Sequence, residues 1–391
     1  MEKKNAWEKY PEGTKRQDVF TFAEEYRKFI SSCKTERECA GEFYRQAKEA
    51  GFADLSEKIA QNTKLKAGDR IVANNMGKGL ALFVIGEKDI EEGMNILGAH
   101  IDSPRMDLKQ VPLYEDTEMA LLDTHYYGGV KKYQWVTLPL ALHGVICKKD
   151  GTTVTVNIGE KPEDPVFGVS DLLIHLAGEQ MEKKASKVIE GENLDLLVGS
   201  IPAASDDEKE KKEMKDRVKA NILNILSKEY GVDEEDFLSA EIEVVPAGAA
   251  RDYGFDRSMI GAYGQDDRVC AYAELRAILD LEGAPERTAV CILADKEETG
   301  SDGVSGMQSQ AFEAFMADLC EQQDVALRHC FAKSFCLSAD VCAAYDPSFP
   351  EVSAKRTEAK LNYGMGICKF TGARGKSGTS DASAELVAYL R

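Results

Sequence analysis

Residues 288–303, TAVCILADKEETGSDG, are the most informative stretch of this 391-residue chain. The first half is a short continuous apolar run, which is typical of a strand buried on both faces. Two adjacent glutamates, Glu297 and Glu298, follow the end of that strand and face a loop rich in glycine and serine. Neighbouring carboxylates repel each other in a constricted loop, and bound cations would remove that cost. A solvated acidic loop is the alternative that this motif alone leaves open.

Helical and strand patterns alternate on both sides of this stretch. Helices are predicted over 20–51, 267–283 and 305–323, and strands over 80–85, 94–99 and 334–340. Such alternation predicts an α/β fold with a mainly parallel sheet covered by helices on both faces.

The middle of the chain has a different character. Residues 152–159, TTVTVNIG, alternate apolar and polar side chains, which favours a half-exposed antiparallel strand. We therefore predict a β-rich inserted domain over 107–245. The catalytic domain would then comprise 1–106 plus 246–391.

Polar clusters also follow two other predicted strands. In GAHIDSPR, His100 and Asp102 are two residues apart, so their side chains are expected to point the same way. The imidazole could bind a metal while the carboxylate orients it through the other ring nitrogen. The segment SAD, which ends a strand, delivers Asp340. Ligands of open α/β sheets bind beyond the carboxyl ends of strands, so these clusters should meet.

A fourth cluster, GQDDR over 264–268, opens the helix predicted at 267. Asp266 is either a carboxylate that bridges two metal ions or an ordinary helix N-cap. With it the chain offers one histidine and three carboxylates, with a free glutamate beside them. Nitrogen and oxygen donors without thiolate suit zinc, manganese or cobalt in a hydrolytic site. Two such ions would polarise a carbonyl and activate a shared water.

Other chemistries find little support in the sequence. A G-x-S-x-G after a strand and an H-E-x-x-H motif are both absent, and the glycines of 371–378 match a phosphate-binding loop only loosely. The net charge of −19 argues against nucleic acid and anionic lipid as partners. The ten cysteines form no C-x-x-C pair, and neither a signal peptide nor a membrane-spanning run is seen. We expect a reduced, cytoplasmic protein.

Four segments, in this order and spacing, resemble the aspartyl aminopeptidase family of co-catalytic metallopeptidases. They are GAHIDSPR, VPAGAARDYGFDRSMIGAYGQDDR, DKEETGSDG and SADVCAAYDP, and the resemblance covers nearly the whole chain. It implies a catalytic α/β domain with an inserted dimerisation domain, assembled into a hollow tetrahedral dodecamer. It also implies two divalent metal ions, with zinc expected and cobalt or manganese as alternatives.

The resemblance further implies a role for each matching residue. His100, Asp266 and Asp340 would hold one metal, and Asp266 and Glu298 the other. Glu297 would be the general base, and Asp102 the partner that orients His100.

The family also uses a histidine in a Met-His-Ser type motif near its C-terminus, which nothing here matches. Because a helix pattern is still running where the chain stops at Arg391, we expect the C-terminal part to be missing. The alternative is a protein that lacks this ligand, which would be an inactive scaffold.

Two substrate-binding residues follow from the same resemblance. His175 would reach from the insertion of one subunit into the active site of a neighbour, although a histidine on a helix face is the simpler interpretation. Lys369 would face an acidic first side chain of the substrate, with Arg374 and Lys376 able to share that role, unless it is an ordinary surface lysine. The expected function is removal of N-terminal residues, acidic ones above all, from peptides. A broad-specificity aminopeptidase is the alternative.

Overall fold

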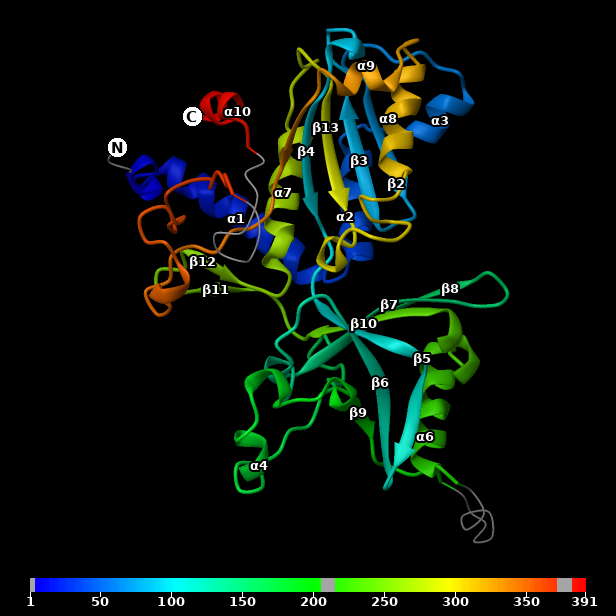
Figure 1. Ribbon diagram of the computed structural model, residues 1–391. Coiled ribbons are helices and arrows are strands. Elements are labelled where there is room, and N and C mark those ends of the chain that lie inside the picture. The colour runs from blue at the N-terminus through cyan, green and yellow to red at the C-terminus, as the bar shows by residue number, and fades with distance from the viewer. Residues whose placement is uncertain (1–3, 205–214, 371–381) are drawn as a thin grey trace. The chain divides into compact units, whose positions relative to one another are not determined.

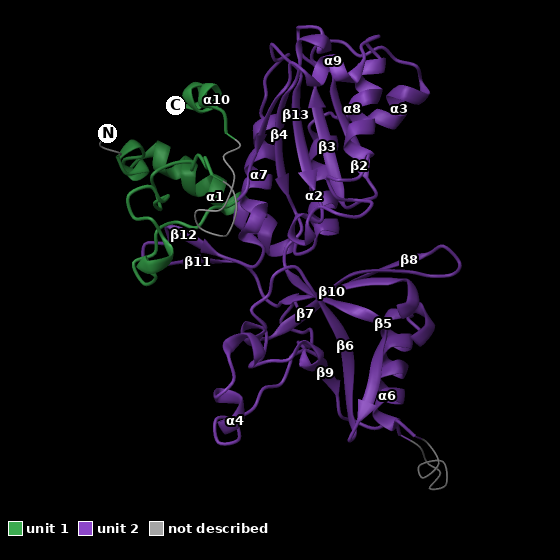
Figure 2. Ribbon diagram, viewed as in Figure 1, with its two compact units in different colours: residues 1–25, 341–391 green, residues 26–340 purple. Residues whose placement is uncertain are grey.

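The computed structural model of the chain describes residues 4–204, 215–370 and 382–391. Two compact units are formed, one by residues 1–25 with 341–391 and the other by residues 26–340, as Figure 2 shows. Among the described helices, none is both long and apolar enough to cross a lipid bilayer.

The larger unit contains a six-stranded sheet with the order β1-β2-β3-β13-β4-β14 (Figure 1). Its strands are β1 (Ala53–Asp54), β2 (Arg70–Asn75), β3 (Gly79–Val84), β4 (Asn95–His100), β13 (Ala289–Ala294) and β14 (Phe335–Ser338). The strand β4 runs parallel to β13 and β14, and β1 runs parallel to β2. Only β3 is antiparallel to its neighbours in this sheet, so the sheet is mixed. The α/β class predicted from the sequence is confirmed.

The apolar run of β3 explains why helices cover both faces of this sheet. All six of its residues are buried, and its side chains alternate between two separate cores. Leu82 packs in a core with side chains of α2 (Glu36–Glu49) and α7 (Gln265–Leu279). Phe83 packs on the opposite face with side chains of α8 (Ala311–Glu321). Burial of a side chain of this size contributes about 2 kcal/mol.

A second six-stranded sheet has the order β8-β7-β10-β5-β6-β9, and all its neighbouring strands are antiparallel. The strands are β5 (Arg105–Asp116), β6 (Met119–Tyr127), β7 (Leu140–Cys147), β8 (Thr153–Ile158), β9 (Leu196–Gly199) and β10 (Ala240–Pro246). One face packs on α6 (Arg217–Ile225) through its buried Val218. The strands of this sheet, from Arg105 to Pro246, cover nearly the same residues as the predicted insertion 107–245. The division into domains itself remains a prediction.

The predicted single helix over 20–51 is two helices in the structure, α1 (Thr14–Ser32) and α2. Thr35 interrupts the predicted single helix because it is the N-cap of α2. Its hydroxyl accepts a hydrogen bond from the Glu38 amide at 3.1 Å, and the Glu38 carboxylate accepts one from the Thr35 amide at 3.2 Å. This reciprocal capping box starts a new helix inside an apolar periodicity that continues across it.

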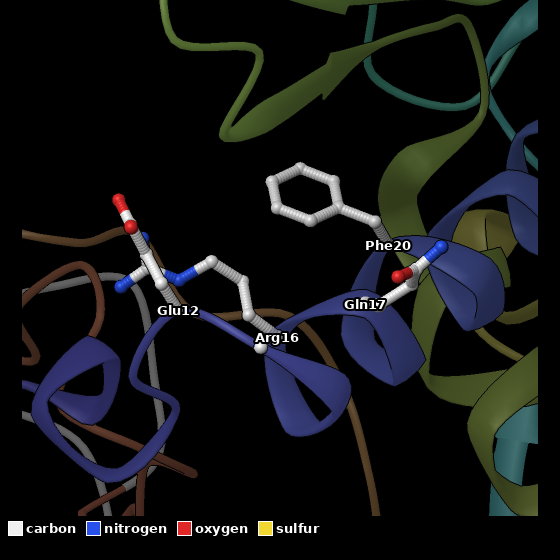
Figure 3. A pocket seen from close by; sticks show the side chains of 5 residues that line it. Glu12, Arg16, Gln17 and Phe20 are labelled. Atoms are coloured by element: carbon white, nitrogen blue, oxygen red, sulfur yellow. The ribbon is translucent and has the colours of Figure 1, made fainter.

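The remaining elements are short. They include α3 (Leu55–Ala60), α4 (Gly178–Met181), α9 (Leu327–Phe331), α10 (Ala384–Leu390) and a two-stranded sheet of β11 (Arg251–Tyr253) and β12 (Met259–Gly261). In the smaller unit, a shallow hollow lies over the start of α1 (Figure 3). Its wall is Glu12 and Arg16, whose charged groups are 3.8 Å apart, with Gln17 and the exposed ring of Phe20. This hollow holds none of the predicted catalytic residues.

Candidate metal centre

Three loops that carry predicted site residues leave the first sheet at the same edge. The parallel strands β4 and β13 end together, since His100 is the register partner of Ala294. The amide of Ala339 continues the pairing of β14 with β4 by donating to the Gly98 carbonyl at 2.8 Å. The residues that follow these strands therefore meet at one place, as the sequence predicted.

Asp266 reaches this place from the start of α7. Helix α7 starts directly after Gly264, whose φ is 79°, but the backbone of Asp266 and Asp267 is not helical, so its regular turns begin after them. The positive φ favours glycine here, and a Cβ would lie 2.2 Å from Nη1 of the buried Arg268 side chain, which would have to move. The hydroxyl of Ser103 donates to the Asp266 carbonyl at 2.8 Å and so ties α7 to the end of β4. The Asp266 carboxylate faces the imidazole of His100 from this position.

The side chains converge around the Nε2 atom of His100. This atom is 3.2 Å from Asp266 Oδ1 and 3.7 Å from Glu297 Oε2. Ligand atoms of His100, Asp266 and Asp340 all lie within 4.8 Å of one another. Glu298 is not a member of that group, but the charge of Asp266 acts on it. The structure thus brings together three of the four predicted metal ligands and the predicted base.

Asp102 holds His100 from the other side of the imidazole ring. The carboxylate is fully buried and its Oδ1 is 3.2 Å from His100 Nδ1, which also makes a hydrogen bond with the Asp102 backbone carbonyl at 3.1 Å. It also accepts hydrogen bonds from the Tyr127 hydroxyl at 2.7 Å and from the amides of Glu297 and Glu298 at 3.2 Å each. Burial alone would raise the pKa of Asp102, but bonds from His100 and Tyr127 lower it below its usual value. The carboxylate is therefore held ionised and points Nε2 toward the acidic cluster.

Electrostatics at the cluster favour a cation. Burial and then the charge of Asp266 raise the pKa of Glu298 to about 7. Burial also raises the pKa of Asp266 and Glu297, and Asp340 contributes to both shifts. Burial lowers the pKa of His100, but its bond to Asp102 and the surrounding carboxylates raise it to about 9. Carboxylates that repel one another around an imidazole are relieved when a metal ion binds.

The surroundings of His100 Nε2 show that the donor set fits a metal ion. Among the described residues, its buried Nε2 atom makes no hydrogen bond of good geometry, although Asp266 Oδ1 lies 3.2 Å away, and a buried polar atom normally makes one. A divalent ion bound by this nitrogen and by the oxygens of Asp266 and Asp340 would satisfy it. Nitrogen and oxygen ligands without thiolate fit a catalytic zinc ion.

Sequence reasoning missed two residues at this site. Tyr127 lies 25 residues after Asp102, at the end of β6, and no motif marks it. Asp267 is fully buried, and among the described residues neither carboxylate oxygen has a hydrogen-bond partner. Burial raises the pKa of Asp267 to about 6. Its place in the GQDDR motif, directly after Asp266, was the one available signal.

His175 does not lie at the cluster of its own chain, and its reach into a neighbouring subunit stays a prediction. His175 is exposed in a turn before α4, which lies beside the second sheet and away from the ends of β4 and β13 in Figure 1. Lys369 is exposed in the smaller unit, with its ammonium group 5.8 Å from the Phe370 ring centre. Arg374 and Lys376 lie outside the described residues.

Comparison with known proteins identifies the family of this chain. Residues 29–391 match the family model described as aminopeptidase I zinc metalloprotease (M18). A probable M18 family aminopeptidase 1 from Clostridium acetobutylicum is 55% identical over 394 residues, which span 100% of this chain and 83% of that protein. The corresponding protein of Thermotoga maritima is 43% identical over 396 residues, with 100% of this chain and 83% of that protein covered.

Solved structures of aminopeptidases have the same fold as this chain. The crystal structure of aminopeptidase I from Clostridium acetobutylicum superimposes with a TM-score of 0.90 at 55% identity, and 100% of this chain and 84% of that chain are covered. The dodecamer of mApe1 from S. cerevisiae, at 23% identity and a TM-score of 0.68 over 86% of this chain and 75% of that one, shares the fold. The chain belongs to the M18 family of zinc metallo-aminopeptidases.

Proposed function

We propose that this aminopeptidase removes one N-terminal residue from peptides at a site with two divalent metal ions. The observation that carries the proposal is the unsatisfied Nε2 atom of His100, with carboxylates of Asp266 and Asp340 within 4.8 Å. His100, Asp266 and Asp340 would hold one ion, and Asp266 and Glu298 the other. The ions, zinc by preference, would supply Lewis acidity toward the scissile carbonyl and a lowered pKa of water.

The protein side chains would divide the remaining work. Glu297 would take a proton from the attacking water and return it to the leaving amine. Its carboxylate is 48% exposed and lies next to the cluster, so it can reach both water and substrate. Burial raises the pKa of Glu297, which brings it closer to the value of an efficient base at neutral pH. Asp102 would keep the proton of His100 on Nδ1.

The substitution Glu297→Gln tests the role of the base. The amide keeps the shape of the side chain but cannot accept the proton, so we expect kcat to fall by about a factor of 100 to 10,000. Zinc content, measured by atomic emission on the same sample, should stay at the wild-type level. An active Glu297→Gln variant would remove Glu297 from this role, and a variant without metal would make it a ligand instead.

The preferred substrate is a second part of the proposal. Resemblance to the aspartyl aminopeptidases favours Asp or Glu at the N-terminus, with Lys369 pairing with the acidic side chain. A panel of Asp, Glu, Leu and Ala aminoacyl substrates distinguishes this preference from the broad-specificity alternative. Equal kcat/KM values across the panel would rule out the acidic preference.

Assembly and location complete the proposal. We infer a homo-oligomer, up to a tetrahedral dodecamer, built through the second sheet as a dimerisation domain. Apolar side chains beside His175 are exposed, with Ile174 at 70% and Leu176 at 67%, and such side chains often mark an interface. Light scattering in solution would measure the assembly directly.

All ten cysteines lie in the described residues and are free thiols, which supports a reducing compartment such as the cytoplasm.

A further inference from the structure

The second sheet reaches the candidate metal centre through the end of β6. Tyr127, the last residue of β6, is the register partner of Arg105, the first residue of β5. Arg105 follows the loop that carries Asp102. The Tyr127 hydroxyl donates to Asp102 Oδ2 at 2.7 Å, which is a short bond to a buried carboxylate. A residue of the second sheet therefore contacts the group that orients His100.

Two cations hold the ring of Tyr127 in place. The guanidinium carbon of Arg105 is 3.6 Å from the ring centre, and the ammonium of Lys296 is 5.6 Å from it. Arg105 is itself buried and paired with Glu243 and Glu36, at 3.3 and 3.6 Å. Cation–π contacts of this kind attract the ring to both charges. The ring cannot rotate away from Asp102 without losing these contacts.

The residue after Tyr127 supplies an independent observation. Gly128 has φ at 72°, and a side chain there would lie 3.3 Å from Glu298 Cβ and 3.5 Å from Pro104 Cβ. The end of β6 is thus packed against both loops that Asp102 joins. Lys296, which contacts the Tyr127 ring, immediately precedes Glu297.

From these contacts we propose that Tyr127 is a positioning residue for the metal centre. Its hydroxyl holds Oδ2 of Asp102 so that Oδ1 stays on His100 Nδ1 and the Nε2 lone pair faces the carboxylate cluster. Through it the second sheet contributes to metal affinity without supplying a ligand. This inference rests on the proposed metal site.

The size of the effect follows from how many groups hold Asp102. Without the Tyr127 hydroxyl, Oδ2 keeps, among the described residues, only the hydrogen bond from the Glu298 amide at 3.2 Å, and the carboxylate gains freedom to turn. Residues that orient a ligand typically change metal affinity by about 10- to 100-fold when they are replaced. Because two backbone amides still hold Asp102, we expect the lower end, about 10-fold, for Tyr127→Phe.

Cobalt(II) binding to the full chain, freed of metal by a chelator, measures this directly. Affinity is obtained by competition with the chelator, and the visible absorption of bound cobalt reports the geometry of its ligands. Tyr126→Phe is the matched control, because Tyr126 is the exposed neighbour on the same strand. We expect about 10-fold weaker binding and an altered spectrum for Tyr127→Phe, and wild-type values for the control.

The same pair of changes in an Asp102→Ala background separates positioning from packing. Once Asp102 is gone, Tyr127→Phe has no carboxylate to release, so it should weaken cobalt binding no further. A further 10-fold loss in that background, or wild-type affinity and spectrum for Tyr127→Phe, would overturn the inference. If wild-type protein binds cobalt no better than His100→Ala, the proposed metal site fails, and the inference fails with it.

Discussion

Glu274 lies on the buried face of α7, and the fold should hold its carboxyl group protonated at neutral pH. The residue is 8% exposed, and among the described residues its Oε2 atom has no hydrogen-bond partner. Burial, and then the charge of Asp267, raises the pKa of Glu274 from 4.5 to about 8. The substitution Glu274→Gln replaces this group with a neutral side chain of the same shape.

The sign of the effect follows from proton linkage. A carboxyl whose pKa is higher in the folded than in the unfolded state favours folding when it is protonated. The stability of the wild-type protein should therefore fall as the pH rises from 4.5 to about 8, and change little above that. At about 1.4 kcal/mol per pH unit this difference corresponds to about 5 kcal/mol. Relaxation around a buried charge reduces such figures, so we expect about 2–3 kcal/mol.

Urea unfolding of metal-free protein at pH 5 and pH 8.5 measures this difference. We expect Glu274→Gln to match the wild type at pH 5 and to be more stable by about 2–3 kcal/mol at pH 8.5. Glu313→Gln, at an exposed position of α8, is the control and should match the wild type at both pH values. An equal stability difference between wild type and Glu274→Gln at both pH values would refute the argument.

Two further predictions concern metal binding and the second sheet. Bound cations must displace the protons of His100, with its pKa raised to about 9, and of Glu298, with its pKa raised to about 7. Cobalt affinity measured by calorimetry should therefore rise from pH 6 to pH 9 with proton release, and a pH-independent affinity would contradict this. In β7, a side chain at Gly144 would lie 1.9 Å from the Glu241 carbonyl oxygen, so Gly144→Ala should destabilise the fold by about 3 kcal/mol or more. Thermal unfolding checks this against Gly178→Ala, where a side chain meets nothing within 4 Å; equal midpoints would count against the close packing of β7 on β10.

Short-range patterns in the sequence were enough to predict the centre of the site. The apolar run before Glu297 is β13, and the run before His100 is β4. The rule that ligands gather beyond strand ends then predicted their meeting with Asp340, and the structure places His100, Asp266 and Asp340 together. This worked because strand burial and parallel pairing are local consequences of hydrophobic patterning.

Helix limits were predicted less well. Periodicity runs from α1 into α2 without interruption, and the capping box of Thr35 and Glu38 was decisive for the break. Capping depends on two hydrogen bonds, which hydrophobic periodicity does not encode. Glu274 illustrates a similar limit, since an acidic residue in a helical pattern is normally assigned to the solvent side, whereas here it is buried.

By itself the sequence determined the α/β class, the family and the residue types that converge at the candidate centre, because these depend on local pattern and motif. Only the tertiary structure decided which groups support them. Tyr127 comes from another sheet, and its bond to Asp102 exists because β6 ends against the loop after β4. The raised pKa values of Glu298 and Glu274 arise from burial and from neighbouring charges. Desolvation and long-range contact depend on the packed chain, and so no local stretch of sequence contains them.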